Sequence, residues 1–194
     1  LENAPVEIEA LFFFFFNGGK AMAKIDLARS KNRSIEVVKE IAQHEIFKAM
    51  FSDKQLIKLP QDEIVVKTWQ ALNETDPDYS AKHFNDLMEE LEITDENKQQ
   101  IMSVYDKVFE AYKKVLIKDK GMANLIMKKT HFLTYVAFVE QFESVDKLAE
   151  WLMLFYGNMP TEYIEASKQQ TTSNKNTTTR INIVKESVEK FLNI

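Results

Sequence analysis

Cysteine is absent from this chain, and glycine and proline are scarce. The absence of cysteine excludes thiolate zinc sites, thiol nucleophiles and disulfide frameworks, and it is typical of the reducing cytoplasm, which is the location we expect. Glycine and proline contribute four residues each to a chain of 194. Because turns depend on these residues and alternating β-branched stretches are few, the composition predicts long helices rather than sheets.

Long apolar runs are missing as well. The run that holds the five phenylalanines, Ala10–Phe16, is far shorter than the ~20 residues that a membrane-spanning helix needs. Glu7 and Glu9 precede it, where a signal peptide would carry positive charge. We therefore expect no membrane segment. The net charge of −5 is mildly acidic and gives no global attraction to nucleic acid.

The segment before the first glycines is punctuated like a helix. Asn3 is a suitable cap, Pro5 suits the first turn, and Gly18 is suited to the left-handed residue that closes a helix. A buried strand is the alternative, because phenylalanine favours strands and the run is continuous. The chain begins at Leu1 rather than at methionine, which predicts a processed product, a subcloned piece or a chain that lacks its natural beginning.

Apolar residues recur at helical spacing through most of the remaining chain. A stripe of aromatic residues in the most apolar segment predicts the central core helix. The polar tract 168–179 holds no apolar residue and predicts a flexible loop. The expected fold is all-α, an irregular array of seven to nine helices with no sheet. The periodic segments are 34–51, 61–73, 79–92, 95–116, 122–142, 145–156 and 180–192.

Metal-ligand candidates are few. His44 follows Glu40 by four residues, a spacing that metal sites use. No second pair of this kind is present, which favours a solvated helical pair and no metal site. We interpret His131 as a hydrogen-bonded core or boundary residue and His83 as exposed. A carboxylate cluster at a helix junction favours solvated caps over acid–base chemistry; its members are Glu89, Glu90, Glu92, Asp95 and Glu96.

Seven lysines gather between residues 107 and 129, against the three carboxylates of Asp106, Glu110 and Asp119, which gives a local surplus of four positive charges. Lysines that face one way would neutralise phosphates of a nucleic acid. The alternative is an ordinary solvated helix end. A Ser/Thr/Asn tract before Arg180 would add donors to a phosphate backbone. The candidate nucleic-acid contacts are Lys113, Lys114, Lys128, Lys129 and Arg180.

The stretch LFFFFFNGGKAMAKIDLARS resembles the end of a DUF262 domain, the ParB-like N-terminal domain of GmrSD-type restriction proteins. That family shows an aliphatic or aromatic helix, then Arg-aliphatic-Asn-x-Gly-Gly, then Leu-x-Lys-x-Asp-Leu. Phe14 and Phe16 stand where the family has arginine and asparagine, and Met22 stands for the leucine. The matching positions are Gly18, Gly19, Lys24, Asp26 and Leu27.

The resemblance implies that residues 1–33 are the end of a ParB-like domain and that residues 34–194 are a helical domain. The family's Asp-Gly-Gln-Arg nucleotide motif and a His-Asn-His nuclease box are absent from this sequence. We therefore expect no catalytic residue, no cofactor and no enzyme activity in this chain, with an NTP bound elsewhere in the parent protein. The implied role is a scaffold or DNA-sensing module in restriction-modification and phage defence. Its partners would be the missing ParB-like and nuclease domains or subunits, and DNA.

Two other functions stay open. A standalone helical protein-interaction module would expose part of the aromatic stripe, Phe132–Phe142, and bind a partner helix in a groove. A helical-bundle enzyme that uses a metal or a small molecule is disfavoured, because duplicated Glu/His pairs are lacking.

Overall fold

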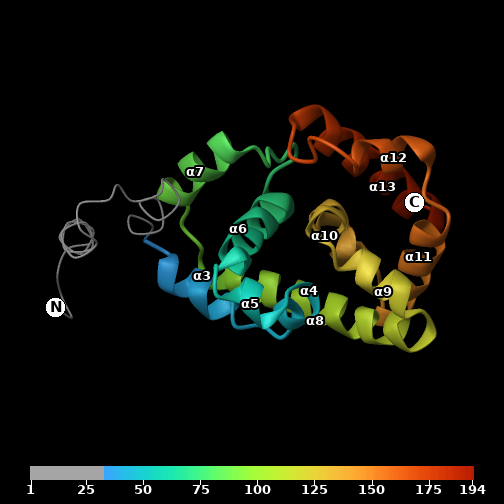
Figure 1. Ribbon diagram of the computed structural model, residues 1–194, viewed down its shortest axis with the longest axis horizontal. Helices are drawn as coiled ribbons and strands as arrows, with labels where there is room; N and C mark the ends of the chain where they lie inside the picture. Colours follow the sequence, from blue (N-terminus) through green and yellow to red (C-terminus); the bar gives the residue numbers. More distant parts are fainter. Residues whose placement is uncertain (1–32) are drawn as a thin grey trace.

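The chain folds as an all-α array, which confirms the expected fold class. The computed structural model describes residues 33–194, apart from the side chain of Lys82. These residues form eleven α-helices, one 3-10 helix and no strand (Figure 1). The elements are α3 (Ile35–Ile41), α4 (Ile46–Met50), α5 (Asp53–Leu56), α6 (Pro60–Asn73), α7 (Ala81–Glu90), α8 (Asp95–Lys118), α9 (Lys120–Ile126), α10 (Lys129–Tyr135), η1 (Val136–Gln141), α11 (Val145–Gly157), α12 (Thr161–Ala166) and α13 (Asn174–Leu192).

The longest described helix, α8, packs against α3, α4, α6, α9, η1 and α11. Thr94 and Asn97 form a capping box at its start, with the Thr94 side chain accepting from the Asn97 N–H at 3.2 Å. Its buried residues recur every three or four positions from Ile101 to Val115. In Figure 1, α8 runs along the lower edge, with α3 and α7 at one end of the molecule and α11 to α13 at the other. No helix in residues 33–194 combines the length and apolar composition needed to cross a membrane.

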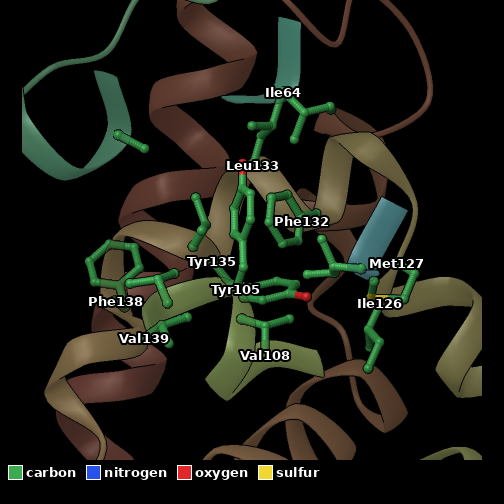
Figure 2. Close-up of a cluster of buried hydrophobic side chains, with 14 of the residues drawn as sticks. Ile64, Tyr105, Val108, Ile126, Met127, Phe132, Leu133, Tyr135, Phe138 and Val139 are labelled. Carbon is green, nitrogen blue, oxygen red and sulfur yellow. The ribbon is translucent and has the colours of Figure 1, made fainter. Parts of the chain in front are cut away.

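The core is built around α10 and η1. Five consecutive residues of α10, from His131 to Tyr135, are buried, because α6, η1, α9 and α13 all contact this helix. Figure 2 shows Phe132 and Tyr135 among side chains of α8, including Tyr105 and Val108. The most apolar segment of the sequence therefore lies at the centre, as its aromatic stripe predicts.

The central segment is not one helix, however. It divides into α9, α10 and η1, with Lys128 in an extended conformation between the first two. A straight helix through 122–142 would present apolar residues on every side at once. The break lets Ile126, Met127 and Phe132 all be buried although they lie on both sides of it.

The predicted helix over 34–51 also divides, into α3 and α4. The cause is local to His44, whose Nδ1 accepts the backbone N–H of Ile46 at 3.1 Å. That N–H would bond the carbonyl of Ala42 in a continuous helix, so the histidine ring replaces a backbone partner and a new helix begins.

The prediction of a loop over the polar tract 168–179 is correct for the first half of the tract only. Its second half, from Asn174 to Thr179, belongs to α13. Ser173 caps the helix, and its side chain accepts from the N–H of Asn176 at 3.4 Å. Thr177 is buried because it lies on the same face as Val184 and Val188. Because Thr177 is polar, a search for apolar residues at helical spacing misses the start of α13.

Candidate functional site

The loop residues that carry the family resemblance lie outside the described residues. These are Gly18, Gly19, Lys24 and Asp26, and the phenylalanine run before them is also outside.

Three of the four lysines proposed as nucleic-acid contacts form salt bridges with carboxylates. Lys113 lies 2.7 Å from Glu110 on its own helix, α8. Lys114 lies 3.0 Å from Asp146 and links α8 to α11.

The second pair of lysines lies at the start of α10. Lys128 is exposed, whereas Lys129 lies 2.6 Å from Glu63 on α6. The carboxylate partners of Lys114 and Lys129 belong to different helices, α11 and α6. The positive surplus that the sequence shows is thereby reduced at each of these positions.

Arg180 is not a surface contact, which corrects the expectation for this residue. It is 2% exposed. Its guanidinium donates to the carbonyls of Ala166 and Thr171, each at 2.7 Å, and to the hydroxyl of Thr134 at 3.2 Å. The arginine thus joins α12, the following loop and α10 to α13 from inside the molecule.

Within the described part of the chain, the histidines belong to no group of metal-ligating side chains. Glu40 pairs with Lys98 at 2.7 Å, whereas Nε2 of His44 lies 3.1 Å from Asp106, so the expected Glu40–His44 pair does not form. The acidic cluster is exposed, and Asp95 and Glu96 lie in the first turn of α8, as expected of caps. Among residues 33–194, no group of three metal-ligating side chains is close enough to hold an ion.

His131 lies at one end of a hydrogen-bonded chain that includes two buried tyrosine hydroxyls. Its Nδ1 lies 2.9 Å from the hydroxyl of Tyr163, which lies 3.1 Å from that of Tyr156. Burial lowers the pKa of His131 to about 4 and raises the pKa of Tyr163 to about 12. Neither group changes its protonation near neutral pH, so the cluster offers no poised general acid or base there. It confirms the interpretation of His131 as a hydrogen-bonded core residue.

Lys67 of α6 is a second buried cation, which the sequence alone did not reveal. It is 2% exposed, lies 2.8 Å from Glu63 and donates to the carbonyl of Tyr79 at 2.9 Å. Burial lowers the pKa of Lys67, and the Glu63 carboxylate opposes that shift. The lysine holds the segment before α7 against α6, which is a structural role.

The cost of burying a polar group without a hydrogen-bond partner can be measured at Tyr135. Its ring is fully buried, and its hydroxyl has no hydrogen-bond partner among the described residues. We expect Tyr135→Phe to raise the free energy of unfolding by about 1 kcal/mol, because it removes a buried polar atom without opening a cavity. Urea denaturation measures this change.

The matched control is Tyr105→Phe. Tyr105 is equally buried, but its hydroxyl donates to Thr68 at 3.0 Å. We expect the control to lose about 1 kcal/mol or more, since Thr68 then lacks its partner. A loss of stability in Tyr135→Phe would show that its hydroxyl is satisfied.

Two grooves lie along α11 on the surface. The α8–α11 groove has a volume of about 760 Å³, and the α11–α13 groove one of about 700 Å³. Leu154 and Asn158 line both grooves. The first groove is lined by Lys114, Ile117, Lys118, Asp146, Ala149, Glu150, Met153, Leu154 and Asn158. The second is lined by Leu154, Phe155, Asn158, Pro160, Ile183, Glu186, Ser187, Lys190 and Phe191.

Large apolar side chains stand exposed on these grooves. Ile117 is 86% exposed and Leu154 is 56% exposed. A signal for the second was present in the sequence, since Trp151–Tyr156 is a run of six apolar residues within one helix. A surface helix buries one face only, so part of such a run must point outwards. Four of the six are buried, and Met153 and Leu154 are not.

No model of a known protein family, no curated protein and no solved structure matches this chain.

Proposed function

We propose that the helical domain is a protein-interaction module that docks a partner protein through the grooves on either side of α11. The observation that carries the proposal is the pair of exposed side chains Ile117 and Leu154, standing on two walls of one groove. Contiguous apolar surface that is hollowed and rimmed by charge is typical of protein-binding sites. The charges of Lys118 and Glu150 supply that rim.

The docking surface differs from the one that the interaction hypothesis expected. Phe132 is fully buried, and Phe138 and Phe142 are 8% and 2% exposed, so the aromatic stripe has no accessible face. The stripe holds the domain together, and the apolar groups offered to a partner come from α8 and α11 instead.

A scaffold role of this kind is also what the resemblance to the DUF262 family implies. In that setting the grooves would hold the missing ParB-like or nuclease domains or subunits. Both this identity and DNA contact by the lysines stay predictions. The exposed apolar walls support a protein partner more directly than the lysines support DNA, because Lys113, Lys114 and Lys129 each have a carboxylate nearby.

Site-specific photo-crosslinking tests the proposal on the full chain in the cells that produce it. A photoreactive residue replaces Ile117 in one variant and Ile57 in a control. The control is closely matched, because both residues lie in a Leu-Ile-Lys triplet and Ile57 is 80% exposed away from the grooves. We expect a discrete protein crosslink at position 117 that is absent at position 57.

A second substitution shows whether the crosslink depends on the groove. Leu154→Asp places a charge on the opposite wall and is expected to remove the crosslink at position 117, because the apolar contact is lost. Equal crosslinking at both positions, or none at position 117, would overturn the proposed docking surface.

A further inference from the structure

The two walls of the α8–α11 groove carry opposite charge. The α8 wall presents Lys114 and Lys118, and the α11 wall presents Asp146 and Glu150. Lys114 and Asp146 lie 3.0 Å apart within the chain. Lys118 and Glu150 are a basic and an acidic side chain on opposite walls of the same groove, and Glu150 also lies 3.6 Å from Lys147 on its own helix.

Each wall also carries one exposed apolar side chain. Ile117 belongs to the α8 wall and Leu154 to the α11 wall. Both walls thus present the same pattern, a charge beside an apolar group, with the sign of the charge reversed between them.

Such a surface is complementary to itself. A two-fold axis that runs along the groove places the α8 wall of one copy over the α11 wall of the other. Ile117 of each copy then faces the wall that carries Leu154 of the other, and Lys118 of each copy faces the wall that carries Glu150 of the other. Each exposed apolar group thus faces a wall with an apolar side chain, and Lys118 and Glu150 each face a wall of opposite charge. A rotation about an axis across the groove would instead bring like charges together.

We propose that the occupant of the α8–α11 groove is a second copy of this chain, related to the first by this two-fold axis. The inference rests on the proposed docking function and names its partner. A two-fold contact uses the same patch on both copies and closes on itself, so it gives a dimer rather than a filament.

Charge-reversing substitutions on the two walls of the groove test this proposal. Dimerisation of the full chain is measured by sedimentation velocity over a range of concentrations. We expect the wild-type chain to reach the mass of two chains. Lys118→Glu and Glu150→Lys each replace two attractive contacts in the dimer with repulsive ones. Each is expected to raise the dimer dissociation constant by roughly tenfold or more.

Mixing the two single variants should restore the dimer. A mixed pair places Glu at position 118 opposite Lys at position 150 and keeps Lys118 opposite Glu150 in the second contact. The double variant in one chain should dimerise for the same reason. Lys58→Glu is the matched control, because Lys58 is an exposed lysine that also follows a Leu-Ile pair, and it should leave dimerisation unchanged.

The outcomes separate this inference from the docking function on which it rests. A wild-type chain that stays monomeric, or a mixture that fails to restore the dimer, overturns the second copy as partner. If the crosslink at position 117 then joins a different protein, the docking surface stands and only the partner is wrong. A monomeric chain with no crosslink at position 117 overturns both. Unchanged circular dichroism and thermal unfolding of each variant confirm that folding is intact.

Discussion

Arg180→Ala is expected to lower the free energy of unfolding by about 4 kcal/mol. The guanidinium is 2% exposed and makes three internal hydrogen bonds. Its removal leaves the carbonyls of Ala166 and Thr171 and the hydroxyl of Thr134 without their donor, and it also leaves a cavity. Urea denaturation followed by circular dichroism measures the loss.

Two controls separate the geometry of the guanidinium from its charge. Arg180→Lys keeps the charge but lacks the planar fork that reaches three acceptors, so we expect roughly half of the loss to persist. Lys185→Ala removes an exposed cation from the same helix, where it lies a loose 3.9 Å from Glu189, and should change stability by less than about 0.5 kcal/mol. A loss near the control's value in Arg180→Ala would contradict the internal role.

Acidification from pH 6.5 to pH 4 is expected to cost the wild-type chain about 3 kcal/mol through His131 alone. Burial, together with the charges of Lys128 and Arg180, lowers the pKa of His131 from its usual 6.5 to about 4. The unfolded chain therefore binds a proton in this pH range and the folded chain does not. Stability from this group is complete above pH 6.5 and is lost as the pH falls to about 4.

His131→Gln isolates this contribution from the other acid-sensitive groups. The variant lacks the titrating ring, so its stability should fall less between pH 6.5 and pH 4 than that of the wild type. The difference between the two curves should be flat above pH 6.5 and should change by about 3 kcal/mol below it. Urea titrations at pH values from 4 to 8 give both curves, and parallel curves would show that His131 is protonated in the folded chain.

The elements that sequence predicted well are those whose signals are local. Thr94 is followed by Asp95, Glu96 and a helical apolar period, and α8 begins where that pattern places it. The burial of Phe132 and its aromatic neighbours likewise follows from their spacing and size. In each case the residues that decide the structure lie within a few turns of one another.

The features that sequence could not predict depend on distant neighbours. The residues next to Arg180 in the sequence do not indicate that carbonyls of α12 and its loop will surround it. The sequence alone therefore predicts a surface cation. The same holds for Lys67, whose carbonyl partner belongs to Tyr79. The period of α8 shows that Ile117 lies off the buried face, but only the placement of α11 turns that exposed isoleucine into one wall of a groove.

The bonds of Arg180 have a consequence for how the domain opens. One side chain of α13 holds the end of α12, the loop after it and α10, and the buried Tyr163 of α12 lies against His131 of α10. If α13 lifts away, the loop and the end of α12 lose their donor at the same moment. We therefore expect cooperative local unfolding in this region, in which α12, its loop and α13 exchange their amide protons as one unit and not helix by helix.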